Sequence, residues 1–149
     1  MILVIGFGSP FGADRLGWEV VTHMAPIEGV MTICCDRTSL EWLHVAGNAR
    51  RVYVIDALDF GGTAGAILQA SWEPGRLPAA PLLSQHGLSP FWGLSLAAAL
   101  GDLNAPVTII GAQIDTQLDP LIDQDWVSIR VLQSVTDALS QAIRLDLNS

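Results

Sequence analysis

The sequence predicts a three-layer α/β fold, in which a mainly parallel, twisted sheet of about five strands carries helices on both faces. Short apolar runs recur along the chain, and most lead through a turn into a segment whose apolar residues have helical spacing. This alternation is typical of parallel strands joined by helical crossovers. The chain has 149 residues and shows no internal repeat, linker or low-complexity segment, so we expect a single domain over residues 1–149.

The first half of the chain contains three predicted strands and two predicted helices. The opening run is too apolar for a strand with one face in solvent and suits a strand buried on both faces. Thr38 or Ser39 is the expected N-cap of the second helix. In order, the elements are strand Ile2–Gly6, helix Asp14–Met24, strand Val30–Cys35, helix Ser39–Ala46 and strand Arg51–Ile55, which Asp56 ends.

The second half adds two strands and two helices. The strand after the glycines at 61, 62 and 65 has no helix before it, which leaves room for one antiparallel edge strand. Ser89-Pro90 begins the next helix by cap and first-turn chemistry. In order, the elements are strand Ala66–Ser71, loop Pro74–Pro81, a helix from Ser89 to about Leu100, strand Pro106–Gly111 and a long helix from about Asp125.

The chain is acidic and contains no lysine. Its 15 acidic residues against 7 arginines give a formal net charge of −8. Without an amine side chain, a Walker-type phosphate loop and Schiff-base or pyridoxal phosphate chemistry are excluded, and the negative charge argues against nucleic-acid binding. We see no signal peptide and no run of about 20 apolar residues. We therefore expect no membrane insertion and a cytoplasmic location.

The two cysteines, Cys34 and Cys35, are neighbours on a predicted strand. Neighbouring side chains on a strand point to opposite faces, so the pair is badly placed for a disulfide or a zinc site. We expect both to be small buried hydrophobic residues.

Residues with catalytic or ligand chemistry lie at several strand ends, and ligands of open α/β sheets bind beyond the carboxyl ends of the strands. Asp14 follows the first strand, Asp56 closes the third, and His86 lies in the loop before the third helix. Two carboxylates and an imidazole suit a divalent nickel, zinc, iron or manganese ion, or acid–base chemistry. Taken singly, each residue also has a purely structural interpretation: Asp14 as a helix cap, Asp56 as a solvated strand end and His86 as a loop histidine.

The loop after the first strand also admits a dinucleotide site. Gly6-Phe-Gly8 lies between a strand and a helix, and Asp36 ends the second strand, where a ribose-binding acid would lie. Against this, Phe11 stands at the third glycine position, and Asp14 puts a carboxylate where the pyrophosphate would need to sit. A small nucleotide-binding module remains an alternative.

A set of short motifs runs in order along nearly the whole chain. They are Gly6-Phe-Gly8-Ser-Pro, Asp14 with Gly17, Val54-Ile-Asp56-Ala57 with Gly62 and Gly65, Ser84-Gln-His86-Gly87-Leu88, and Val107-Thr-Ile-Ile-Gly111-Ala-Gln113. Each motif alone is weakly specific, whereas their order and spacing together are fairly specific. With these motifs the chain resembles the hydrogenase maturation endopeptidases, which remove the C-terminal extension from the large subunit of nickel–iron hydrogenases.

The resemblance implies a function and a set of site residues. In that family two acids and a histidine recognise the nickel already inserted in the precursor. Carried over by position, they are Asp14, Asp56 and His86, as metal-contacting and catalytic residues. The nickel is then carried by the partner, a hydrogenase large-subunit precursor. We expect a monomeric endopeptidase that is either metal-dependent or aspartate-dependent. In the first case the metal polarises the peptide carbonyl and an aspartate accepts a proton; in the second the aspartates alone carry out the hydrolysis.

Two segments depart from the family's pattern. Ser9 stands where the family's first motif has an asparagine. A one-residue gap in that loop puts Asp14 on the ligand position, whereas without the gap Arg15 would fall there. We prefer the gapped alignment because it also places Val20 and Val21 of the first predicted helix on the family's apolar helix positions. The second departure is Asp36-Arg37-Thr38, which is looser than the family's Asp-Gly-Gly-Thr.

These departures keep open an alternative function, that of a binding protein without enzymatic activity. A non-catalytic adaptor would bind a hydrogenase subunit without cutting it. Arg15 beside Asp14 supports this alternative, because a cation there would repel a metal ion.

Overall fold

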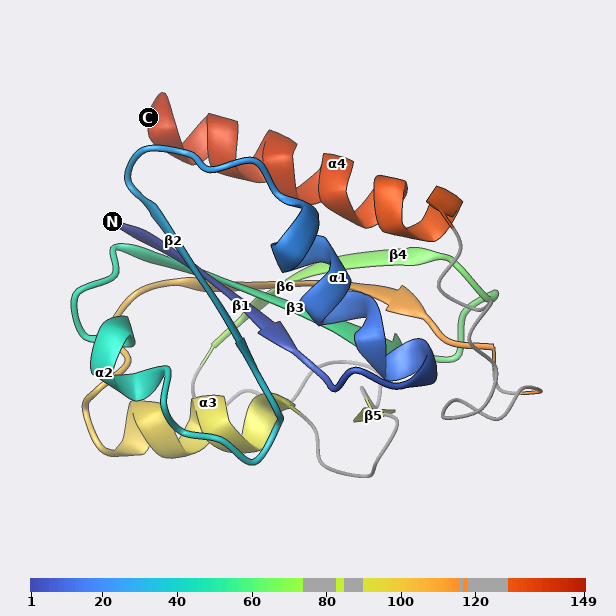
Figure 1. Ribbon diagram of the computed structural model, residues 1–149. Coiled ribbons are helices and arrows are strands. Elements are labelled where there is room, and N and C mark those ends of the chain that lie inside the picture. Colours follow the sequence, from blue (N-terminus) through green and yellow to red (C-terminus); the bar gives the residue numbers. More distant parts are fainter. Residues whose placement is uncertain (74–82, 85–89, 116, 118–128) are drawn as a thin grey trace.

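The computed structural model describes residues 1–73, 83–84, 90–115, 117 and 129–149. Figure 1 shows a central sheet between two layers of helices. In chain order the described elements are β1 (Ile2–Phe7), the 3-10 helix η1 (Gly12–Arg15), α1 (Leu16–His23), β2 (Val30–Cys35), α2 (Leu43–Ala46), β3 (Arg51–Asp59), β4 (Ile67–Trp72), β5 (Leu83–Ser84), α3 (Pro90–Ala99), β6 (Val107–Gln113) and α4 (Ile129–Leu147).

The sheet has the strand order β2-β1-β3-β6-β4, and β5 pairs with β3 in addition. The pairs β1–β2, β1–β3 and β3–β6 are parallel, whereas β4 runs antiparallel to β6 at the edge. The predicted sheet, mainly parallel with one antiparallel edge strand, is therefore confirmed. Because β1, β2 and β3 are parallel neighbours, their carboxyl ends lie together at one end of the sheet.

The helices cover both faces of the sheet, as the sequence predicts. α1 and α4 lie on one face, and α2 and α3 on the other (Figure 1). The central strand β3 supplies both cores: Tyr53 and Ile55 pack toward α1 and α4, and Val52 and Val54 pack in the opposite core. Burial on both faces explains why β1 and β3 are continuous apolar runs without alternation.

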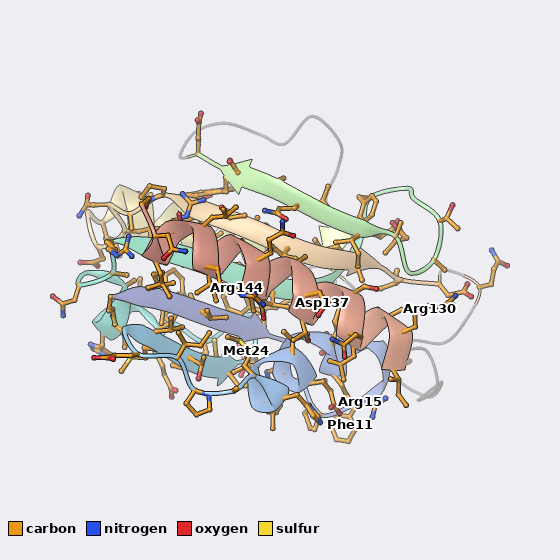
Figure 2. All side chains as sticks on the ribbon, turned by 90° about the horizontal axis from the view of Figure 1, so that it is seen from above. Phe11, Arg15, Met24, Arg130, Asp137 and Arg144 are labelled. Carbon is orange, nitrogen blue, oxygen red and sulfur yellow. The ribbon has the colours of Figure 1, made fainter. Side chains whose placement is uncertain are left out.

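Helix α4 is amphipathic over its described length. Val135, Leu139 and Ile143 are buried against the sheet, while Arg130, Asp137 and Arg144 are exposed and lie along the helix in Figure 2. The predicted start of this helix at about Asp125 falls outside the described residues. Within the described part of the chain, no helix combines the length and apolar character needed to span a bilayer.

Strand β2 lies at the edge of the sheet and is less buried than β1 or β3. Cys35 is buried, but Cys34 is exposed, and both thiols are free. The expectation that both cysteines are buried was therefore wrong for Cys34. β2 has a neighbouring strand on one side only, and its side chains before Cys35 are all partly or fully exposed.

Two described elements differ from the expected boundaries by more than two residues. The strand expected to end at Asp56 continues to Asp59, because β6 pairs with Asp56–Leu58 and β5 pairs with Leu58 and Asp59. The helix expected over Ser39–Ala46 covers only Leu43–Ala46, and Trp42 is its N-cap without a side-chain cap. Thr38 and Ser39 instead donate their backbone N–H groups to the Asp36 carboxylate, which forms a turn.

Candidate functional site

The candidate site lies where the parallel strands β1, β2 and β3 end. In the sheet register, Gly6 of β1 is opposite both Cys34 of β2 and Ile55 of β3. Asp14 follows β1, Arg37 follows β2, and Asp56 is the residue after Ile55. The carboxyl ends of the strands therefore bring these three side chains together, although they lie far apart in the sequence.

Asp14 is held by the tight loop between β1 and α1. It lies in η1, where its carbonyl oxygen accepts the Ser9 backbone N–H at 2.9 Å. A Cβ atom on Gly8 would lie 2.1 Å from that carbonyl oxygen, and one on Gly17 would lie 2.3 Å from the Phe7 carbonyl oxygen. Glycine at both positions lets the loop and α1 approach the sheet closely enough to bury Asp14, which is 2% exposed.

Asp56 is a buried residue inside a strand and not a solvated strand end. It is 0% exposed, and its position in β3 is opposite Gly111 of β6. Its Oδ1 atom accepts the Ala57 backbone N–H at 2.8 Å. A carboxyl group in such a place needs polar partners, because burial of an unpaired charge is strongly unfavourable.

Arg37 supplies those partners. Its Nε donates to Asp56 Oδ2 at 2.8 Å, and its Nη2 donates to Asp56 Oδ1 in a short bond. Its Nη1 lies 2.5 Å from Asp14 Oδ1. The guanidinium therefore binds Asp56 with two parallel bonds and bridges to Asp14, while the whole arginine is only 6% exposed.

The local sequence explains how Arg37 reaches this place. Asp36 and Thr38 are both exposed, and Asp36 Oδ1 accepts the Thr38 N–H at 2.8 Å and the Ser39 N–H at 3.0 Å. Asp36 also accepts a hydrogen bond from the Thr38 side chain, and this bond contributes most to a lowered pKa of Asp36. The two backbone hydrogen bonds lower that pKa further. The charged Asp36 thus holds a turn from which the Arg37 side chain points into the protein.

Burial and charge act in opposite directions at this ion-pair triad of Asp14, Arg37 and Asp56. Burial raises the pKa of Asp56 to about 7, although the Arg37 guanidinium acts to lower it. Burial acts to lower the pKa of Arg37, but the carboxylates of Asp56 and Asp14 outweigh it and raise that pKa further. The triad therefore holds a permanent cation beside a carboxyl group that can exchange a proton near neutral pH.

Arg15 faces away from the triad. Its Nε donates to the Gly12 carbonyl oxygen at 3.0 Å, and its Nη1 lies 3.6 Å from Glu19 Oε1. Figure 2 shows Arg15 beside the exposed Phe11 at the surface. Asp14, and not Arg15, is the residue of this loop that lies beside Asp56.

The third residue expected at the site, His86, lies outside the described residues. Nearby in the chain, Ser84 of β5 pairs with Leu58 of β3, and Leu58 is two positions after Asp56. In the described part of the chain, no group of three or more His, Cys, Asp or Glu side chains is arranged to hold a metal ion. Asp14 and Asp56 do lie close together, but the Arg37 guanidinium binds both carboxylates and bridges them.

Sequence reasoning missed Arg37 as a residue of the site. The available signal was its position: it directly follows a parallel strand, in the segment that departs from the Asp-Gly-Gly-Thr pattern. A lone arginine in a polar turn is usually a surface residue, so its charge gave no reason to place it inside.

Gln113 shapes the loop after β3, close to the same end of the sheet. It is buried, and its Oε1 accepts the backbone N–H groups of Phe60 at 2.8 Å and Gly62 at 3.0 Å. Its Nε2 donates to Asp59 Oδ1 at 3.0 Å. One side chain at the end of β6 thus satisfies several polar groups of the loop that follows Asp59.

Comparison with known proteins identifies the fold. No protein-family model matches the sequence, and no curated protein matches it. Among solved structures, the hydrogenase maturating endopeptidase HybD from E. coli matches 97% of this chain and 93% of its own, with a TM-score of 0.73 at 19% identity. The chain has the fold of the hydrogenase maturation endopeptidases.

Other solved structures of this kind match at similar levels. The [NiFe] hydrogenase maturation protease HybD from Thermococcus kodakarensis matches 95% of this chain and 97% of its own, with a TM-score of 0.73 at 19% identity. HycI, a [NiFe] hydrogenase maturation protease from the same organism, matches 99% of this chain and 92% of its own, with a TM-score of 0.67 at 20% identity. The similarity thus extends over nearly the whole length of each chain.

Proposed function

We propose that this protein is an endopeptidase that removes the C-terminal extension of a nickel–iron hydrogenase large-subunit precursor. The observation that carries the proposal is the full-length similarity of its fold to proteins named as hydrogenase maturation proteases. The buried acids Asp14 and Asp56 at the carboxyl ends of the strands add to it, because ligands of such sheets bind at that end. A cytoplasmic location and a monomeric state remain predictions from the sequence.

Nickel enters the proposal as cargo of the precursor. The sequence resemblance makes Asp14, Asp56 and His86 the residues that would contact it, and a carboxylate–imidazole set suits a divalent ion of this kind. With Arg37 in place, however, the two carboxylates do not fit a metal ion, because the guanidinium already binds three of their four oxygens and puts a positive charge beside them. Recognition of nickel therefore requires Arg37 to move.

The chemistry that the chain's own residues offer is proton transfer. A carboxyl group is an effective general base when its pKa lies near the working pH, and burial places the pKa of Asp56 at about 7. In hydrolysis, Asp56 would take a proton from the water that attacks the peptide carbonyl carbon. The same proton would then pass to the departing amine as the C–N bond breaks. This step requires the same movement of Arg37, because in the closed triad both Asp56 oxygens accept hydrogen bonds from the guanidinium.

The proposal is tested with a nickel-loaded precursor and mass spectrometry of its C-terminus. We expect the wild-type chain to release the extension, and Asp14→Asn and His86→Ala to leave it uncut. His44→Ala is the matched control, because His44 is an exposed histidine on α2. Circular dichroism of each variant checks that it is folded. Normal processing by Asp14→Asn and His86→Ala would contradict the proposed site.

One observation favours a second candidate function, that of a non-catalytic adaptor. The triad is closed, and an adaptor would have no need to open it. The same incubation separates the two candidates. A stable complex with the precursor without any loss of mass would indicate an adaptor, whereas release of the extension would indicate the protease.

The dinucleotide alternative is disfavoured by the same geometry. The buried Asp14 carboxylate lies just before α1, where a pyrophosphate would need the helix N-terminus. Calorimetry with NAD would test this directly, and we expect no heat of binding.

A further inference from the structure

The outer edge of strand β2 presents backbone groups that another chain can pair with. β2 lies at one end of the strand order and, among the described strands, pairs with β1 alone (Figure 1). The Cys35 carbonyl oxygen accepts the Gly8 N–H at 3.1 Å, so the Cys35 backbone faces the β1 side. Alternate residues of a parallel strand turn their backbone groups toward the same neighbour. Thr32 and Cys34 therefore direct their N–H and C=O groups to the outer side.

This edge lacks the side chains that usually protect an exposed strand. Such strands tend to carry charged residues or proline, which prevent pairing with another chain. β2 has the sequence Val-Met-Thr-Ile-Cys-Cys, without charge or proline. Met31, Thr32 and Cys34 are exposed. The strand is therefore suited to take an extended polypeptide as a further strand, held by main-chain hydrogen bonds.

The edge leads directly to the candidate site. Arg37 of the triad is the second residue after Cys35, where β2 ends. An extended chain advances about 3.3 Å per residue. A segment paired along β2 would therefore reach the triad end of the sheet within about two or three residues of its last paired position. The edge is placed to deliver a peptide bond to the end of the sheet that holds the buried acids.

A hollow beside the end of β2 offers a place for one side chain of such a segment. Its volume is about 370 Å³, and Trp18, Thr22 and His23 of α1 are among the residues that line it. The Cys34 thiol lies 4.0 Å from the Trp18 carbonyl oxygen, so the hollow is close to the outer edge of the strand. A side chain opposite Cys34 on an added strand would point to the same face of the sheet as Cys34. In strand addition, pockets of this kind give specificity.

Charge favours a partner segment over a second copy of this chain. Glu28 and Asp36 flank β2 and are both exposed, and no lysine or arginine lies between residues 16 and 36. In a symmetric antiparallel pairing of two copies about Thr32, Glu28 of each copy would come near Asp36 of the other. Like charges opposite one another destabilise a strand pair. A segment with basic side chains would instead meet these carboxylates favourably.

We propose that the outer edge of β2 is the docking site for an extended segment of the hydrogenase large-subunit precursor, which adds to the sheet as a strand and carries basic side chains toward Glu28 and Asp36. This docking site rests on the proposed function and adds to it the surface that presents the segment to be cut. The backbone groups of Thr32 and Cys34 hold its main chain, and the hollow beside α1 takes one of its side chains.

The docking edge is tested by removing one outward N–H group. Proline is tolerated on an edge strand where its missing N–H faces outward, so Thr32→Pro should fold. We expect it to raise the KM for the nickel-loaded precursor, or the Kd if the chain binds without cutting, by about tenfold, because a main-chain hydrogen bond is lost. Thr32→Val is the matched control: it keeps the N–H and the β-branched shape and should match the wild type. Circular dichroism checks the fold of both variants.

Further measurements decide the proposal even if Thr32→Pro does not fold. Thr22→Trp fills the hollow, Glu28→Lys reverses a flanking charge, and each should raise the same constant severalfold. Hydrogen exchange at the Thr32 and Cys34 amides should slow when the precursor binds, whereas exchange at Gln69 of the other edge strand, β4, should not. Unchanged exchange at Thr32 and Cys34 would overturn the proposal, as would wild-type constants for these folded variants.

The outcomes separate docking from cutting. Release of the extension by Thr32→Pro with the KM of Thr32→Val contradicts the docking edge alone. Binding that Thr32→Pro weakens, without any release of the extension by the wild type, contradicts the protease alone. A wild type that neither binds nor cuts the precursor contradicts both. Sedimentation tests for a second copy: dimers that Thr32→Pro abolishes would assign the edge to self-association and overturn the proposal.

Discussion

At the scale of single residues, Asp14, Arg37 and Asp56 are 2%, 6% and 0% exposed, so their charges are shielded from solvent and lie against one another. A buried ion pair adds little compared with an apolar replacement of the same shape, but loss of one partner leaves the other buried without compensation. Removal of one member of this triad should therefore destabilise the fold strongly, whereas replacement of the whole triad by apolar side chains of the same shape should have little effect.

We expect Asp56→Ala to lower the free energy of unfolding by about 3–5 kcal/mol, because buried Arg37 loses the carboxylate that binds it with two parallel bonds. Glu19→Ala is the control: it breaks the partly exposed pair with Arg15, and the expected loss is about 1 kcal/mol or less. Urea denaturation of both variants measures the difference. Similar losses would show that the triad is not coupled as its geometry indicates.

The raised pKa of Asp56 predicts a pH dependence of stability. The folded chain holds this proton up to a pH of about 7, whereas an unfolded aspartate releases it near pH 3.9. The contribution of Asp56 is therefore fully present below about pH 4 and is lost as the pH rises to about 7. Asp56→Asn does not titrate, so its unfolding free energy should fall less over this range. Equal slopes for wild type and variant would contradict the prediction.

At the scale of elements, single side chains join neighbouring segments around the site. Gln113 connects the end of β6 to the loop after β3, and Leu139 packs α4 on the sheet. These contacts link elements that are distant in sequence, so their loss should affect stability more than any local propensity does.

We expect Gln113→Ala to destabilise the protein by about 1–3 kcal/mol, because it leaves the N–H groups of Phe60 and Gly62 without this acceptor. Gln69→Ala is the matched control, since Gln69 is an exposed glutamine in strand β4. Urea denaturation measures both. Equal losses in the two variants would contradict the role given to Gln113.

Leu139→Ala should cost about 2–5 kcal/mol, because it leaves a cavity between α4 and the sheet. Leu145→Ala, on the same helix but 67% exposed, should change the stability by about 0.5 kcal/mol or less. A large effect of Leu145→Ala would show that another surface covers this part of α4.

At the scale of the whole molecule, the two ends of the sheet carry different groups of charged and polar side chains. The carboxyl ends of β1, β2 and β3 hold the triad. At the opposite end, Asp146 of α4 accepts a hydrogen bond from the Tyr53 hydroxyl and lies 3.2 Å from the Arg51 Nε. A substitution at the Asp146 end should therefore lower stability without affecting the chemistry proposed for the triad end.

We expect Asp146→Ala to lower stability by about 1–3 kcal/mol, because the buried Tyr53 loses a charged hydrogen-bond acceptor. Under the proposed function, the folded variant should still release the precursor's extension at the wild-type rate, since Asp146 lies at the far end of β3 from Asp56. Urea denaturation and precursor mass spectrometry measure the two effects. Loss of processing in a folded Asp146→Ala would contradict this separation.

Much of the fold could be predicted because burial leaves a local pattern in the sequence. The continuous apolar runs of β1 and β3 reflect strands covered on both faces, and Leu139 with Ile143 reflects one buried face of α4. The end of β3 could not be predicted, because Asp56–Asp59 is held in the strand by pairing with β6 and β5. The exposure of Cys34 likewise depends on β2 lying at an edge.

Apolar periodicity along the chain is enough to predict the mainly parallel α/β architecture, because it marks the strands and helices whose alternation favours parallel pairing. The sequence also singled out Asp14 and Asp56 as candidate site residues. That these acids share a guanidinium becomes visible only in the folded chain. Arg37 lies in a polar turn, and no local pattern tells whether such a side chain faces solvent or protein. It turns inward because the neighbouring strand ends place two buried carboxylates beside it, and those charges require a counter-charge.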